Sequence, residues 1–297
     1  MRAFLNRGYS LTVGDWKTAD GWKIDHLQVR FDVSKSTNEK DSKNSAVVEV
    51  YNLSPEHIKT LETPYLIADF SVGYYGKEGA LTDIKRLFVG EVVKVTTRKS
   101  GPDVVTQLEL GEGYLELNHA VLSKLVSPGK TVKDVFEEIR QSVPNISRGV
   151  YAGTNVNNRI LSGYPLMGEP RRLLDKLAEA YSVDYRIDDN VLYVNDSTGA
   201  INNPDAQAFV VSQDSGLIDI PYVVQSGSRR SKEDEEAKNA TQWKMLLNPD
   251  IKPGEIVRLE YMDFTGWYKV ESVRHTGDFR GSDWYTEVRC TQNIKTS

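Results

Sequence analysis

The sequence predicts a mainly β protein with an α/β insertion: two antiparallel β-barrel-like tube domains flanking a small α/β middle domain. Alternation of apolar and polar residues with period 2 recurs towards both ends of the chain, whereas helical periodicity is concentrated in the middle. The 15 tyrosines and five tryptophans favour strands, because aromatic side chains suit half-buried pleated surfaces. We therefore expect β domains over residues 1–112 and 205–297, and the middle domain over residues 113–204.

In the first region, residues 24–33 alternate cleanly and predict a strand, and residues 46–53 predict a second one after a polar, lysine-rich loop. Ser54, Pro55 and Glu56 then combine a capping hydroxyl, a first-turn proline and an early acid, which predicts a short helix. Further strands are expected at residues 65–74, 87–97 and 104–110. This antiparallel sheet is expected to curl into a barrel.

The middle region contains two amphipathic patterns. Thr131 is the expected N-cap of a helix that reaches about residue 142, and Pro170 opens a second helix. The expected apolar positions are Val132, Val135, Phe136 and Ile139 in the first helix and Leu173, Leu174, Leu177, Ala180 and Tyr181 in the second. A hairpin follows around Asp188-Asp189-Asn190, and residues 145–158 are expected to be irregular.

The last region reads as strands at residues 208–211 and 217–224, followed by a β-meander over residues 243–291. Proline and glycine place turns at residues 248–250 and 252–254. Strands are expected at residues 255–262, 267–274 and 284–291, with residues 275–283 as a connecting loop. The pattern alone fits any antiparallel sheet.

Composition excludes several classes of protein. The chain has 297 residues, a mean hydropathy of −0.46 and a net charge of −5, so a soluble globular protein without a broad basic surface for nucleic acid is expected. One cysteine allows no internal disulfide and fits synthesis in a reducing compartment. No apolar run approaches the roughly 18 residues of a membrane span, and the first residues lack the apolar core of a signal peptide.

We find no catalytic, cofactor-binding or metal-binding motif, and the four histidines are not at metal-ligand spacing. A nucleophilic pair of Cys290 and His275 is the most specific enzyme hypothesis. The expected hairpin puts Trp284 opposite His275, however, so Cys290 and His275 would lie about 20 Å apart. Asp188-Asp189-Asn190 fits a turn better than a calcium loop, because no glycine and distant glutamate complete the pattern. A carboxylate pair for glycoside hydrolysis remains an open alternative.

Residues 248–254, 266–273 and 275–288 closely resemble the C-terminal domain of phage tail baseplate hub proteins, the late control protein D family. The resemblance implies a trimeric hub that joins a sixfold tail tube to a threefold, membrane-piercing spike, with the tape-measure protein on the same axis. A threefold protein can meet a sixfold ring if each chain contributes two similar β domains, and residues 1–112 and 205–297 are the candidates.

The resulting hypothesis is a non-enzymatic structural subunit without a cofactor, located in the baseplate of a virion tail after synthesis in the host cytoplasm. The resemblance implies a homotrimer whose partners are the tail tube or distal tail subunits, the central spike and the tape-measure protein. DNA passes transiently through its lumen without specific binding. The alternatives are a cell-wall glycan-binding module, based on the middle domain and exposed aromatics, and a peptidoglycan hydrolase.

Two groups of residues are candidates for partner contacts. The segment 225–240 is polar and charged, and its alternative interpretation is a solvated loop. The other candidates lie in the expected loops of the meander. The candidate residues are Arg229, Arg230, Lys232, Phe264, Phe279 and Arg280.

Overall fold

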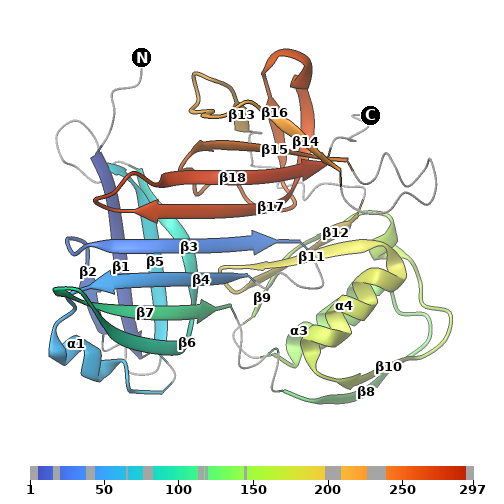
Figure 1. The fold of residues 1–297 in the computed structure, drawn as a ribbon. Coiled ribbons are helices and arrows are strands. Elements are labelled where there is room, and N and C mark those ends of the chain that lie inside the picture. The colour runs from blue at the N-terminus through green and yellow to red at the C-terminus, as the bar shows by residue number, and fades with distance from the viewer. Residues whose placement is uncertain are drawn as a thin grey trace.

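The computed structural model shows one large, mainly antiparallel sheet of 13 strands with a small α/β unit beside it (Figure 1). It describes residues 6–15, 21–37, 44–64, 66–75, 83–112, 117, 120–143, 146–197, 209–225 and 239–291. The predicted fold class, mainly β with an α/β insertion, is confirmed. In the described part of the chain, no helix is long and apolar enough to cross a membrane.

The N-terminal strands form one end of the sheet, in the order β3-β4-β7-β6-β5-β1-β2. Their apolar faces alternate as predicted, and Val29, Phe31 and Val33 of β3 are buried. The bounds are β1 Asn6–Asp15, β2 Gly21–Ile24, β3 Val29–Ser36, β4 Ser45–Tyr51, β5 Leu66–Tyr75, β6 Asp83–Ser100 and β7 Asp103–Gly111. Strand β1 was not predicted from the sequence, and the expected strand over residues 24–33 is in fact the end of β2, a bend and β3.

Helix α1 (Pro55–Thr60) begins as the sequence predicts. The Ser54 hydroxyl accepts a hydrogen bond from the backbone N–H of His57, which satisfies one of the free donors of the first turn.

The described residues of the middle region include helices α3 and α4 and two small sheets around a separate apolar core. Helix α3 (Val132–Gln141) has the predicted N-cap Thr131, completed to a capping box by Asp134. Helix α4 (Pro170–Tyr181) buries Ala178 instead of the predicted Ala180. The strands are β8 Leu122–Val126, β9 Ser147–Ala152, β10 Tyr164–Gly168, β11 Val183–Asp188 and β12 Val191–Asp196.

The hairpin of β11 and β12 turns at Asp189 and Asn190, both with positive φ, as turn chemistry predicts. Residues 145–158 are more regular than expected, because β9 pairs in parallel with β12 and a short 3-10 helix, η1 (Asn155–Asn157), follows. Asparagine and glycine in this segment therefore do not prevent a strand.

The C-terminal strands correct the expected meander in two ways. Strand β15 pairs with β18 and not with the next strand, β16. Strand β17 runs to Asp278, so residues 275–278 belong to the strand and not to a loop. His275 consequently lies opposite Thr286, and Gly277 lies opposite Trp284. The bounds are β13 Phe209–Val211, β14 Tyr222–Gln225, β15 Asn239–Leu246, β16 Ile256–Leu259, η2 Met262–Phe264, β17 Gly266–Asp278 and β18 Trp284–Thr291.

The two β regions are joined edge to edge, and the described strands form no closed barrel by pairing. Strand β17 pairs antiparallel with β3 from Ser272 opposite Ser36 to Asp278 opposite Arg30. Trp284 from β18 also packs edge-on against Phe31 of β3. The outer edge of β3 is taken up by β17, so the N-terminal strands do not close on themselves. Among the described residues, β13 and β14 at the two ends of the C-terminal strands do not pair with each other, so these strands do not close either (Figure 1).

The strand pairing of the two regions nevertheless repeats. We call β1 and β3–β7 the N-terminal set and β13–β18 the C-terminal set. Pairing runs β1-β5-β6-β7-β4-β3 in the first set and β13-β16-β17-β18-β15-β14 in the second, with corresponding chain order. The sets differ in that β1 pairs antiparallel with β5 whereas β13 pairs parallel with β16, and α1 has no helical counterpart between β15 and β16.

The turn at Pro253 and Gly254 provides a test of the meander. Gly254 has a φ of +85°, a conformation that a β-branched side chain rarely adopts. We expect Gly254→Val to lower the free energy of unfolding by about 1–3 kcal/mol, measured by chemical denaturation. The control is Lys232→Gln, in the charged segment 232–236 outside the described residues, which should change the free energy of unfolding little. Equal losses of unfolding free energy for the two variants would contradict the assignment of the turn.

Candidate functional site: a buried charge junction and the sheet edges

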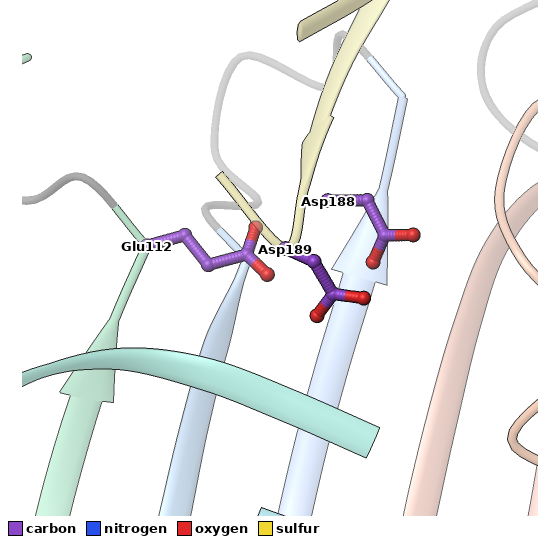
Figure 2. A group of neighbouring side chains, drawn as sticks. All are labelled: Glu112, Asp188 and Asp189. Carbon is purple, nitrogen blue, oxygen red and sulfur yellow. The ribbon is translucent and has the colours of Figure 1, made fainter. Parts of the chain in front are cut away.

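A cluster of buried charges lies where the three regions of the chain meet. Asp188, at the end of β11, accepts hydrogen bonds from Lys35 Nζ of β3 (2.6 Å) and from Lys252 Nζ of the C-terminal region (2.5 Å). Glu112, just after β7, lies beside them, with its Oε1 4.0 Å from Lys35 Nζ. Figure 2 shows Glu112 at the end of its strand and Asp188 and Asp189 at the hairpin tip. We call these five residues the charge junction.

Further polar contacts attach the same hairpin to both β regions. Asn44 donates to Glu112 Oε2 (2.9 Å) and to the carbonyl of Ile187 (2.6 Å). Arg186 donates to the carbonyl of Pro253, and Lys269 Nζ lies 2.7 Å from Asp184 Oδ2. The hairpin is therefore held by side chains from β3, the β3–β4 connection, the 252–254 turn and β17.

Burial and nearby charge shift the pKa values of Asp188 and Glu112 in opposite directions. Burial raises the pKa of Asp188, but Lys35 and Lys252 together outweigh it and hold that pKa well below its usual range. Burial raises the pKa of Glu112 to about 7, and Lys35 only partly counteracts this. Asp188 is therefore ionised throughout the physiological range, whereas Glu112 titrates within it.

The carboxylate oxygens of Glu112, Asp188 and Asp189 lie within 4.8 Å of one another, a spacing that could hold a metal ion. Both oxygens of Asp188 already bind ammonium groups, however, and two lysines beside a metal would repel it. Glu112 and Asp188 are also only 5% and 4% exposed, so the cluster cannot flank a glycan chain. The cluster fits an ion-paired junction between regions better than a metal or hydrolase site.

The candidate contact residues are placed as follows. Arg229, Arg230 and Lys232 lie outside the described residues. Phe279 is half-buried and packs edge-on against Tyr9, while the exposed Arg280 donates to the carbonyl of His26.

Phe264, in η2, packs against the C-terminal core. Both meander phenylalanines are thus used within the chain, and their role in partner contacts remains a prediction.

The structure separates Cys290 from His275 by register. His275 lies opposite Thr286, four residues before Cys290 on β18, or about 13 Å along the strand. Burial raises the pKa of the Cys290 thiol and lowers the pKa of His275 to about 3, so the histidine is neutral. Neither state suits a thiolate–imidazolium pair, and Cys290 lies in the apolar core beside Val288.

We expect Cys290→Ser to leave assembly unchanged and to lower the free energy of unfolding by about 1–2 kcal/mol, because a buried hydroxyl needs a partner. Chemical denaturation measures the loss. The native thiol should react with a thiol reagent only as the protein unfolds; rapid labelling of the folded protein would contradict this placement.

The tryptophans are mostly structural in the described part of the chain. Trp243 and Trp284 are buried, and the half-buried Trp22 stacks on His57. Trp267 is 38% exposed, and the guanidinium of Arg258 lies over its ring. The described residues therefore offer no row of exposed tryptophans for stacking on sugars.

The whole fold has known counterparts among tail proteins. The tail protein from Neisseria meningitidis MC58 is similar over 96% of this chain and 97% of its own, with a TM-score of 0.66 and 12% identity. The 43 kDa tail protein of prophage MuSo2 from Shewanella oneidensis is similar over 96% and 97%, with a TM-score of 0.65 and 10% identity. At these identities the likeness shows the fold alone.

A third protein of similar fold is a component of a type VI secretion system. The Escherichia coli c3393 protein, a type VI secretion system component described as similar to T4 tail proteins gp27 and gp5, is similar over 91% of this chain and 74% of its own. Its TM-score is 0.64 and its identity 10%. No curated protein sequence matches this chain.

The family is shown by sequence. The sequence model described as baseplate hub gp41 matches residues 16–260, which include all of the middle region and most of the two β regions. This confirms the resemblance to baseplate hubs, although the matched stretch ends before residues 266–288, where part of that resemblance was noted. The chain belongs to the baseplate hub gp41 family.

Proposed function

We propose that the protein is a non-enzymatic hub of the baseplate of a virion tail, which assembles as a homotrimer between the tail tube and the central spike. The match to baseplate hubs over residues 16–260 carries this proposal. Its partners are the tail tube or distal tail subunits, the spike and the tape-measure protein, and its work is done by interfaces.

The repeated strand pairing supports the symmetry of this proposal. Each chain carries two strand sets with the same pairing order, so three chains present six such sets. A threefold spike and a sixfold tube can then both bind in register with the same hub. The division into domains at residues 112 and 204 is part of the proposal. Three apolar clusters support it, with the exception that Leu247 and Trp284 of the C-terminal region pack in the N-terminal cluster.

The mass of the assembly in solution tests the proposal. Native mass spectrometry should give three times the 33.4 kDa chain mass, and a larger complex when the cognate spike protein is added. A stable monomer or dimer across the accessible concentrations, or no complex with the spike, would contradict it.

The central opening is proposed to pass DNA without retaining it, so its lining should be neutral or acidic. A basic lining would hold DNA by neutralising its phosphates. The net charge of −5 permits an acidic lining but does not place the acids. A map of the assembled trimer tests this, and a strongly basic opening would contradict it.

A further inference from the structure

Several strand edges of the large sheet have no strand partner among the described residues, among them the outer edges of β2 and β13. Two others lie on β6 and β14. Strand β6 pairs with β5 from Asp83 to Glu91 and with β7 from Glu91 to Ser100. Beyond residue 93, one of its edges is therefore free. Strand β14 pairs with β15 alone, so its outer edge is free as well. Free edges of this kind are templates for pairing with another chain.

The free edges of β6 and β14 are the counterparts, in the repeated strand order, of the edges of β17 and β3 that pair with each other. In the C-terminal set, the register of β17 with β18 shifts between Val270 and Ser272. In the N-terminal set, the register of β6 with β7 shifts between Val92 and Lys94. Each shift lies just where the long strand leaves one neighbour and extends along another. Aligning the two shifts gives a residue-by-residue equivalence between β6 and β17.

The equivalence extends to side-chain contacts. It places Thr97 of β6 at the position of His275 of β17. Thr97 Oγ1 lies 3.2 Å from Thr106 Oγ1 of the next strand, and His275 Nδ1 lies 2.9 Å from Thr286 Oγ1 of the next strand. Thr106 and Thr286 are both fully buried. The same alignment, followed across two further strands in each set, places Val223 of β14 at the position of Val33 of β3.

At these equivalent positions, the side chains on the paired edges are buried and those on the free edges are exposed. His275 lies opposite Val33 in the β3–β17 joint, and these residues are 1% and 0% exposed. Val223 is 49% exposed, and Thr97 is exposed as well. The described residues of one chain therefore do not explain the apolar character of β14, because an edge strand exposed to water is normally guarded by charge.

We propose that β14 of one copy pairs antiparallel with the free edge of β6 in a neighbouring copy, with Thr97 opposite Val223 and Arg98 opposite Tyr222. This contact repeats, between chains, the β3–β17 joint that the structure shows within one chain. The partner of each free edge is thus a second copy of the chain. This proposal rests on the proposed trimer, in which three such contacts close the ring.

Two of the three cations on the free part of β6 are held by acids of the same sheet, and the third, Lys99, lies at its end and falls opposite Pro221 in this register. Lys94 Nζ lies 3.0 Å from Glu109 Oε1, and Arg98 Nη2 lies 2.8 Å from Glu49 Oε1. Lys94 and Arg98 are thus drawn over the sheet by acids of β7 and β4, the next two strands, instead of guarding the edge. Tyr222 is 53% exposed on β14, and its ring offers a face for the planar guanidinium of Arg98.

Disulfide trapping tests the register. Opposite residues of antiparallel strands lie about 4.5–5.5 Å apart at Cα, within the range of a disulfide. In the full chain, Thr97→Cys combined with Val223→Cys should shift the chain from the monomer band to covalent dimer and closed trimer bands after mild oxidation. The matched control, Thr97→Cys with Val224→Cys, is one residue out of register and should stay monomeric on a non-reducing gel.

Mass measurement of the same samples separates the two proposals. A trimer that forms no cross-link overturns the β6–β14 contact and leaves the proposed hub standing. Monomers without a cross-link overturn both. Equal cross-linking of the test and control pairs overturns the register, because it indicates random collision. Cross-linking of the test pair alone, in a trimer, supports the contact.

Discussion

Asp188→Asn is expected to lower the free energy of unfolding by about 3–5 kcal/mol, because it leaves two ammonium groups at the charge junction without their shared counter-ion. Lys35 is 6% exposed and cannot turn to water, and Asp188 is the residue to which both Lys35 and Lys252 donate. The asparagine has the same shape, so the loss reports charge and not packing. Chemical denaturation at neutral pH measures it.

Asp189→Asn is the matched control, one residue along the same turn. Asp189 lies 3.9 Å from Lys252 and is partly exposed, and its φ of +53° suits asparagine. We expect its free energy of unfolding to change by less than about 1 kcal/mol. Similar losses for the two variants would mean that the turn geometry, and not the ion pairs of Asp188, holds the hairpin in place.

The elements that the sequence predicted well are those set by local patterns. The Thr131 cap, the apolar positions of α3, the Asp189–Asn190 turn and the short helix after Ser54 all depend on residues within one turn of each other. Strand β1 is an exception: its buried residues Tyr9, Leu11 and Val13 alternate and only Gly8 departs from the pattern, so a local signal was present although the strand was not predicted.

The arrangement of the strands could not be predicted because it depends on long-range pairing. Nothing near His275 indicates that β17 continues to Asp278, since it continues there by pairing with β3, some 240 residues earlier in the chain. The same pairing takes up the outer edge of β3, at which the N-terminal strands could otherwise have closed. Alternation predicts which face of a strand is buried, but it does not say which strand covers its edge.

The charge junction was missed for a related reason. Asp188 has the sequence context of a turn, and it does lead into one, but its partners come from β3 and from the 252–254 turn. From the sequence, Lys35 and Lys252 would be expected to lie on the surface, as lysines usually do. Their burial follows from the docking of the hairpin between the two β regions, a fact of tertiary structure alone.

Glu112→Gln is expected to stabilise the protein in alkaline solution but not in acid. The pKa of Glu112 is about 7 in the folded chain and near 4.5 when the carboxyl is exposed to water. The folded state therefore binds this proton more tightly, so the contribution of Glu112 to stability is greatest below the lower pKa and falls as the pH rises through the higher one. Asp188 stays ionised across this window and does not contribute to the change.

Because glutamine resembles the protonated acid, the variant should match the parent protein near pH 5 and exceed its free energy of unfolding by on the order of 1–3 kcal/mol at about pH 8.5. Glu109→Gln, three residues earlier on β7 and in a surface pair with Lys94, should show no such divergence across this range. Denaturation curves at both pH values decide the matter. Parallel pH profiles for the parent protein and Glu112→Gln would mean that the Glu112 carboxyl is not buried as the structure describes, and that water reaches the point where the three regions meet.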